Sequence, residues 1–244
     1  MTTVLSVRAL EKSFGAVRAL GPIDLDVAAG ERLGIIGPNG SGKTTLINCV
    51  SGLLAPDRGT IAFMGADVTA LPAWRRARLG LSRSFQIPQP FAGMTVLENL
   101  LVPLDCRNRG RRGAAGTAAR ADEVLGATGL AARRDRPAET LSQLELRKLE
   151  LARALVAEPR VLIVDEAMAG LSEAEIDEVL ALLLRLAGTG VAVIMIEHIM
   201  HAVMRFSERV ACLDTGLLIA AGTPAAVAAD PTVQKVYFGD QADR

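Results

Sequence analysis

The sequence is poor in aromatic residues, histidine and cysteine. Aromatic residues make up 3% of the 244 positions, and there are two histidines and three cysteines. The cysteines, Cys49, Cys106 and Cys212, lie far apart and form no C-x-x-C pair. This spacing argues against a disulfide framework and against a zinc cluster. We therefore expect reduced thiols that are mostly buried.

The chain also lacks a net charge and a long apolar run. Lys plus Arg and Asp plus Glu both total 27, which argues against nucleic acid or an anionic membrane surface as the main partner. The apolar stretches, such as residues 191–196, are too short to span a bilayer, and the first residues do not form a signal segment. We expect a cytoplasmic protein. Half of the residues are hydrophobic, enough for one domain with a sizeable core.

Two hydrophobic patterns predict two kinds of strand. Residues 4–7 and 23–27 alternate between apolar and polar, which is typical of half-buried antiparallel strands, and Gly21-Pro22 predicts a turn before the second segment. Short continuous apolar runs at 33–36, 161–164 and 191–196 predict strands that are buried on both faces.

A helical lobe is predicted between residues 95 and 158. Apolar residues recur there at helical spacing, and the basic stretch 107–113 interrupts the pattern as a loop. Three helix starts carry a hydroxyl residue followed three positions later by Glu, a capping-box pattern: Thr95 with Glu98, Ser142 with Glu145, and Ser172 with Glu175. The predicted fold class is α/β: a core with a mostly parallel sheet and an N-terminal antiparallel β layer (residues 1–94 and 159–244), with an inserted helical subdomain (95–158).

A phosphate-binding loop follows the first buried strand. The loop reads Gly37, Pro38, Asn39, Gly40, Ser41, Gly42, Lys43, Thr44. It matches G-x-x-x-x-G-K-[ST] between a strand and a helix, where main-chain N–H groups and the helix N-terminus attract phosphate. We expect Lys43 to bridge the β- and γ-phosphates, Thr44 to hold Mg²⁺, and Thr45 to bind the α-phosphate.

Two acids end a second buried strand. Asp165 and Glu166 follow the apolar run 161–164, which places both carboxylates at the carboxyl edge of the sheet, where ligands bind in such folds. We expect Asp165 on the Mg²⁺ side and Glu166 beside the attacking water. The two motifs together predict a site for a magnesium nucleoside triphosphate.

Further motifs resemble those of ABC ATPases, in the same order and over nearly the whole chain. The resemblance implies that Gln86 links the Mg²⁺ site to the helical lobe, and that His198 contacts the γ-phosphate and the attacking water. It implies that residues 169–172 cross a dimer interface and that Phe14 stacks on the adenine. It also implies that Ser142 reaches the nucleotide of a partner subunit. Metal binding by His198 and His201 is disfavoured because no Cys or second histidine pair accompanies them.

Finer features resemble the ATP-binding subunits of branched-chain amino-acid importers. They are the segments 76–80, 85–91, 94–100, 196–198, 222–224 and 230–231. The resemblance implies a head-to-tail pair of different ATPase subunits beneath two membrane-spanning permease subunits, on the cytoplasmic face of the inner membrane. A periplasmic binding protein would deliver the solute. Urea and amide importers share much of this pattern, and that alternative stays open.

The signature segment departs from the family pattern. ABC ATPases usually have Leu-Ser-Gly-Gly-Gln, whereas this chain has Leu141, Ser142, Gln143, Leu144 and Glu145. Side chains in place of two glycines obstruct a close approach of the backbone to phosphate. The carboxylate of Glu145 adds negative charge near a polyanion. The hypothesis is that the composite site closed by this segment hydrolyses ATP slowly or not at all.

Three other functions compete with a transport ATPase. An ABC ATPase of DNA repair or translation would usually carry a coiled-coil insertion or a second ATPase half, and neither is present. A regulatory nucleotide-binding module without turnover would explain the altered signature, but Glu166 argues against it. A small-molecule kinase would share the phosphate loop without Gln86 and His198.

Overall fold

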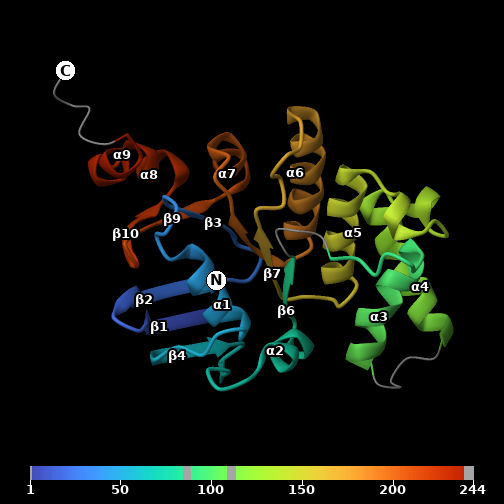
Figure 1. The fold of residues 1–244 in the computed structure, drawn as a ribbon, viewed down its shortest axis with the longest axis horizontal. Helices are drawn as coiled ribbons and strands as arrows, with labels where there is room; N and C mark the ends of the chain where they lie inside the picture. The colour runs from blue at the N-terminus through green and yellow to red at the C-terminus, as the bar shows by residue number, and fades with distance from the viewer. Residues whose placement is uncertain (1, 85–88, 109–113, 239–244) are drawn as a thin grey trace.

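The chain folds into two sheets, a helix packed between them, and a set of helices on one side (Figure 1). The computed structural model describes residues 2–84, 89–108 and 114–238. No helix within those ranges combines the length and apolar character needed to cross a membrane.

Four strands within residues 3–67 form an antiparallel sheet in the order β2-β1-β4-β5. Its strands are β1 (Thr3–Phe14), β2 (Val17–Ala28), β4 (Arg58–Phe63) and β5 (Ala66–Asp67). The sequence prediction of an antiparallel layer is confirmed, but the predicted turn at Gly21-Pro22 is wrong. That pair lies inside β2, and the chain reverses at Gly15, whose φ is 59°.

Packing and sheet position explain why Gly21-Pro22 does not turn. The N–H of Gly21 donates to the carbonyl of Gly216 at 2.8 Å, which ties this part of β2 to the other sheet, and Cδ2 of Leu217 packs against Gly21. β2 is an edge strand, and an edge strand tolerates the missing N–H of Pro22.

The second sheet is mostly parallel and has the order β10-β9-β3-β8-β7-β6. Its strands are β3 (Arg32–Ile36), β6 (Leu81–Ser84), β7 (Val161–Asp165), β8 (Ala192–Ile196), β9 (Arg209–Asp214) and β10 (Leu217–Gly222). The β9–β10 pair alone is antiparallel among these described pairings. The carboxyl ends of β3, β7 and β8 therefore meet at one edge of the sheet.

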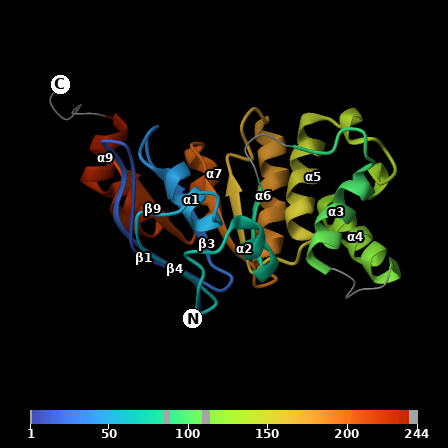
Figure 2. The same cartoon turned by 60° about the horizontal axis from the view of Figure 1, so that its bottom comes forward.

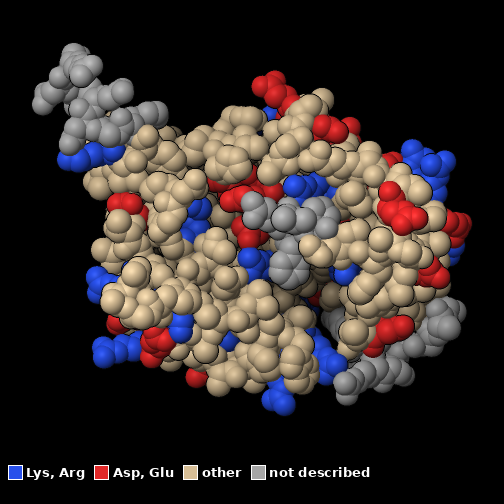
Figure 3. Space-filling view, viewed as in Figure 1, with Lys and Arg blue, Asp and Glu red and all other residues tan. Residues whose placement is uncertain are grey.

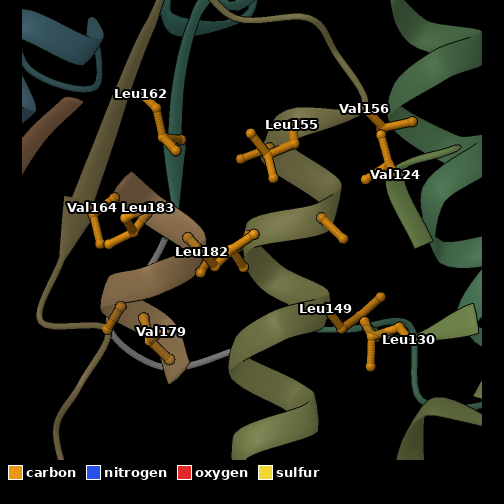
Figure 4. Packing of buried hydrophobic residues seen from close by; sticks show 14 of the residues in the cluster. Val124, Leu130, Leu149, Leu155, Val156, Leu162, Val164, Val179, Leu182 and Leu183 are labelled. Carbon is orange, nitrogen blue, oxygen red and sulfur yellow. The ribbon is translucent and has the colours of Figure 1, made fainter. Parts of the chain in front are cut away.

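Both faces of the parallel sheet are covered, which accounts for the continuous apolar runs. Successive side chains of a strand point to opposite faces, so Val161 and Ile163 pack with α1 (Lys43–Ser51) and the antiparallel sheet. Leu162 and Val164 pack on the opposite side, together with residues of α5 and α6 (Figure 4). At about 25 cal/mol per Å² of buried apolar surface, these two faces supply the main stabilisation of the core.

The helical lobe consists of α3 (Val96–Asn108), α4 (Ala114–Thr128), η1 (Ala131–Arg133), η2 (Ala138–Thr140) and α5 (Gln143–Leu155). Figures 1 and 2 both place α3 and α4 at the end of the molecule away from α9. α3 runs to Asn108, so the predicted loop begins later than residue 107, and 109–113 lie outside the described residues. The exact boundaries of the lobe, 95–158, stay a prediction.

The remaining helices cover the sheet and the C-terminal side. They are α2 (Ala73–Leu79), α6 (Glu173–Ala187), α7 (Met200–Phe206), α8 (Pro224–Ala229) and α9 (Pro231–Phe238).

Each of the three predicted helix starts has its hydroxyl residue and Glu in hydrogen-bond contact. Cys49 and Cys212 are buried and Cys106 is exposed, and none of the three forms a disulfide.

Candidate functional site

The phosphate loop lies between β3 and α1 and depends on two glycines. Gly37 has φ 148° and Gly42 has φ 103°, values that L side chains rarely adopt. A Cβ on Gly37 would lie 2.2 Å from the carbonyl oxygen of Leu213, so the loop can follow this path only with glycine there. No side chain caps the N-terminus of α1 at Gly42. The first N–H groups of α1 therefore face the loop, and this arrangement suits an anion.

Lys43 folds back over the loop that precedes it. Its Nζ donates to the carbonyl oxygens of Gly37 and Pro38, at 2.8 and 2.9 Å, and lies 3.4 Å from Oγ of Ser41. Burial lowers the pKa of Lys43, while the nearby charges of Glu166 and Asp165 act in the opposite direction. The structure therefore brings Lys43 close to both predicted acids. An ammonium held at the mouth of the loop can meet a phosphate by exchanging carbonyl partners for phosphate oxygens.

Asp165, at the end of β7, is paired with an arginine from the neighbouring strand. Nη2 of Arg83 lies 2.6 Å from Oδ2 of Asp165, and Nη1 of Arg83 donates to Oδ1 of Asn48 at 2.7 Å. Both charged side chains are only 9% exposed. Arg83 on β6 thus connects Asp165 with α1. In Figure 3, acidic and basic side chains meet at the centre of the face, between α1 and α6.

Glu166 occupies a strained backbone position just beyond β7. Its φ is 47°, in the left-handed region that non-glycine residues rarely adopt. Its N–H donates to the carbonyl of Ile196 at 2.9 Å, which joins the end of β7 to the end of β8. Such strain persists only where the surrounding structure enforces it, and it is common at functional sites.

His198 is the second residue after β8 and presents an exposed ring. Its side chain is 63% exposed, whereas that of the preceding Glu197 is fully buried. Oε1 of Glu197 accepts the N–H of Met168 at 2.9 Å. Burial raises the pKa of Glu197. His201 is the second residue of α7, and the described residues contain no cluster of three metal-ligating side chains.

The altered signature segment begins α5 with a complete capping box. The N–H of Glu145 donates to Oγ of Ser142, and the N–H of Ser142 donates to Oε2 of Glu145 at 2.9 Å. The second carboxylate oxygen, Oε1, accepts from Nε of Arg133 at 2.6 Å. The Ser142 N–H and Arg133 lower the pKa of Glu145. Arg133 therefore offsets much of the negative charge that the sequence suggested at this point.

The side chain that replaces the first signature glycine contacts the loop after β7. Nε2 of Gln143 donates to the carbonyl of Ala169 at 3.4 Å, and Nη2 of Arg147 donates to the same oxygen at 3.3 Å. Gly170 has φ 78°, and a Cβ there would come within 2.7 Å of Nε2 of Gln143. The signature segment and residues 169–172 of one chain are thus in direct contact.

The remaining predicted nucleotide contacts are Phe14, Gln86, Thr44 and Thr45, and the structure describes all of them except Gln86. Phe14 ends β1 and is 52% exposed, with Nζ of Lys12 5.8 Å from the ring centroid, so its face is accessible to a planar ligand. Gln86 lies outside the described residues, as does Phe85. Thr44 is exposed on the first turn of α1, next to the half-buried Thr45.

The sequence analysis missed Arg83 and gave Glu197 no role. A charged residue within a short buried strand, three positions before Gln86, was a usable signal for Arg83. Glu197 had a similar signal, because it follows five buried apolar residues of β8. Neither partner, Asn48 or Met168, could be inferred from local pattern.

The residues present fit a magnesium ion bound with a nucleotide. The Asp165 carboxylate and the Thr44 hydroxyl supply oxygen donors of the kind that Mg²⁺ prefers, and Lys43 lies nearby as a phosphate partner. Proteins often supply only one or two oxygen ligands to Mg²⁺, and the phosphates of the substrate then complete the coordination of the ion.

Two family models match the chain. The model described as ABC transporter matches residues 20–169, and the one described as branched-chain amino acid ATP-binding cassette transporter matches residues 218–243. The first span runs from β2 through the loop after β7, and the second begins in β10.

Similar proteins match over almost their whole length. The chain is 35% identical to the probable branched-chain amino acid transport ATP-binding protein LivG of Archaeoglobus fulgidus, covering 98% of this chain and 96% of that protein. It is also 35% identical to the lipopolysaccharide export system ATP-binding protein LptB of Acidithiobacillus ferridurans, covering 99% of each. The solved ADP conformation of MJ1267, an ATP-binding cassette of an ABC transporter, is 31% identical, with a TM-score of 0.89 over 98% of this chain and all of that one.

Proposed function

This chain belongs to the ABC transporter ATP-binding family, and we propose that it powers an importer for branched-chain or other hydrophobic amino acids. The observation that carries the proposal is the match of residues 218–243 to the branched-chain amino acid cassette model. This segment includes most of β10 and all of α8 and α9, outside the phosphate loop and the acidic strand end. Its similarity therefore reflects more than the motifs that every ABC ATPase shares.

In the proposed mechanism, the residues at the carboxyl edge of the parallel sheet divide the work. The N–H groups of the loop 37–42 and the Lys43 ammonium hold the phosphates. Thr44, Gln86 and Asp165 would hold Mg²⁺, which would supply charge neutralisation for the phosphates. Glu166 orients or deprotonates the attacking water, and His198 contacts the γ-phosphate and that water. Phe14 stacks on the adenine.

The proposed assembly is a head-to-tail pair with a second ATPase subunit beneath two permeases, at the cytoplasmic face of the membrane. A groove of about 350 Å³ between α2, β6, α3 and α5 suits a permease segment. Trp74, Val102 and Pro103 line it, so an apolar permease surface would be well matched. A periplasmic binding protein would reach the complex only through the permeases.

Export is the second candidate function, because the similarity to LptB equals that to LivG. The ATPase fold does not fix the direction of transport, since the permeases and binding protein select and move the solute. Copurification from native membranes, followed by identification of the permease partners, decides between them. Importer permeases with an amino-acid-binding protein support the proposal, and lipid-exporter permeases contradict it.

Lys43→Ala tests the nucleotide site on which both candidates depend. Losing a charged hydrogen bond to phosphate should weaken Mg·ATP binding about 10-fold to 100-fold in isothermal titration calorimetry of the full chain. Lys148→Ala is the matched control, because Lys148 pairs with Glu178 on the α5–α6 surface and should bind nucleotide normally. Equal affinity in the Lys43 variant and the wild type would refute the proposed site.

A further inference from the structure

Glu197 connects the end of β8 with the loop that follows β7. Its Oε1 accepts the N–H of Met168 at 2.9 Å, and the residue is 1% exposed. Met168 immediately precedes residues 169–172, the segment that also contacts Gln143 and Arg147 of α5. One carboxylate thus lies between the position of His198 and the loop predicted to face the partner subunit.

The second oxygen of this carboxylate is buried without a hydrogen bond. Oε2 of Glu197 makes no hydrogen bond of normal geometry among the described residues, although the nearby main-chain N–H of His198 acts to lower the pKa of this carboxyl, and a buried acceptor left unsatisfied is costly. Nδ1 of His198 lies 4.0 Å away, and the imidazole is exposed enough to turn toward it. Arg147 and Glu166 are the other charged groups that interact with this carboxyl.

We propose that Glu197 is a positioning residue for His198. When nucleotide is bound, Oε2 accepts the Nδ1–H of His198, which fixes the tautomer and leaves Nε2 without a proton, able to accept a hydrogen bond from the attacking water. Because Oε1 stays on the Met168 N–H, the position of His198 and that of the loop 169–172 are coupled. The inference rests on the proposed role of His198.

The tautomer of His198 gives a direct test that does not depend on turnover. The chain has only two histidines, so in a His201→Gln background the imidazole ¹⁵N signals come from His198 alone. With Mg²⁺ and a non-hydrolysable ATP analogue, long-range ¹H–¹⁵N spectra of the full chain should show the Nδ1–H form. Glu197→Gln keeps the side-chain size and an oxygen for Met168, but its NH₂ group donates a hydrogen bond and cannot accept one. It should therefore favour the Nε2–H tautomer, with Nδ1 as the acceptor.

Kinetics supply the second readout. In the assembled transporter, Glu197→Gln should lower kcat about 10-fold to 100-fold, the range found when a group that orients an active histidine is lost, and should change KM for ATP less than about 2-fold. Glu31→Gln is the control, because Glu31 precedes β3 at the opposite end of the sheet and pairs with Arg209. It should keep wild-type kcat and the Nδ1–H tautomer.

The outcomes separate the inference from the function on which it rests. Wild-type turnover in His198→Ala would overturn the role of His198 itself. Loss of turnover in His198→Ala, with an unchanged tautomer and kcat in Glu197→Gln, would overturn only the positioning role of Glu197. If Glu197→Gln does not fold, Glu197→Asp gives the same readout, because the shorter side chain moves the carboxylate away from Nδ1.

Discussion

Asp165 and Arg83 show how one ion pair serves both the folded core and the candidate site. The carboxylate that is proposed to face Mg²⁺ is 9% exposed and lies 2.6 Å from the Arg83 guanidinium. A charge so far removed from water needs a partner, and Arg83 provides it in the absence of metal. Because Arg83 also binds Asn48, the pair fixes β6 and β7 against α1.

Arg83→Met is therefore expected to destabilise the nucleotide-free chain by roughly 3 kcal/mol, the cost of leaving a buried charge unpaired. Mg·ATP should restore part of this loss, because the proposed metal supplies positive charge near Asp165. Urea unfolding with ATP alone, with Mg²⁺ alone and with both measures the effect. Arg205→Gln, which breaks the exposed Arg205–Asp177 pair, should cost less than about 1 kcal/mol. Equal losses in the two variants would contradict a special role for Arg83.

At the scale of strands and helices, the sequence predicts elements whose environment is uniform along their length. The runs at 33–36 and 161–164 are apolar throughout because both faces of the parallel sheet are covered. The turn prediction at Gly21-Pro22 failed because a contact with another part of the chain holds that pair in a strand: the N–H of Gly21 donates to the carbonyl of Gly216, just before β10. Local pattern contains no record of a contact made across the molecule.

In the candidate site, too, features made by consecutive residues were predictable, and contacts between distant residues were not. The phosphate loop was predictable because its residues are consecutive, and the two acids were predictable because they end a recognisable strand. The Arg83 contacts were not, since they join residues 35 and 82 positions apart. The Arg133 contact with Glu145 was missed likewise, so the charge attributed to the signature segment was too large.

The start of α5 carries a prediction about the two composite sites. Replacing Gln143 and Leu144 with glycine should remove the side chains that obstruct phosphate and allow the partner's ATP to turn over. Total ATPase activity of the reconstituted heterodimer should rise up to about 2-fold, because two sites then turn over instead of one. In a Glu166→Gln background, the glycine variant should retain measurable activity where the parent retains little.

Helix propensity requires a control for that experiment. Glycine at two helical positions costs about 1 kcal/mol each. Ala225→Gly with Ala226→Gly places the same burden on exposed positions of α8, away from the proposed nucleotide sites. That variant should leave ATPase activity unchanged. Unaltered activity in the signature variant, with Glu166 or the corresponding glutamate of the partner subunit mutated, would count against asymmetric sites.

Across the whole molecule, the groove and the nucleotide site share a residue. Arg83 lines the groove between α2, β6, α3 and α5, and the same side chain is paired with Asp165. A permease segment in the groove would therefore press on β6 at the point where β6 is tied to the proposed Mg²⁺ ligand. This arrangement offers a short physical connection between permease movement and nucleotide chemistry.

Trp74 is the groove residue best suited to test that connection. Trp74 is 53% exposed, and the guanidinium carbons of Arg75 and Arg78 lie 5.1 and 4.9 Å from the centroid of its ring. A large aromatic group with neighbouring arginines is typical of an interface hot spot. Trp74→Ala should leave Mg·ATP binding by the isolated chain unchanged. It should weaken binding to the detergent-solubilised permeases by about 30-fold, equivalent to a 2 kcal/mol hot spot.

Met64→Ala is the matched control, because Met64 is 54% exposed but lies at the β4–β5 turn, on the antiparallel sheet. Surface plasmon resonance against immobilised permeases should give wild-type affinity for it. If both variants bind equally well, the permeases do not dock in the groove, and permease movement does not reach the nucleotide site through Arg83. If only Trp74→Ala binds the permeases more weakly, the groove is the docking surface. Permease-stimulated ATPase activity should then fall in parallel with binding, because β6 would no longer be displaced.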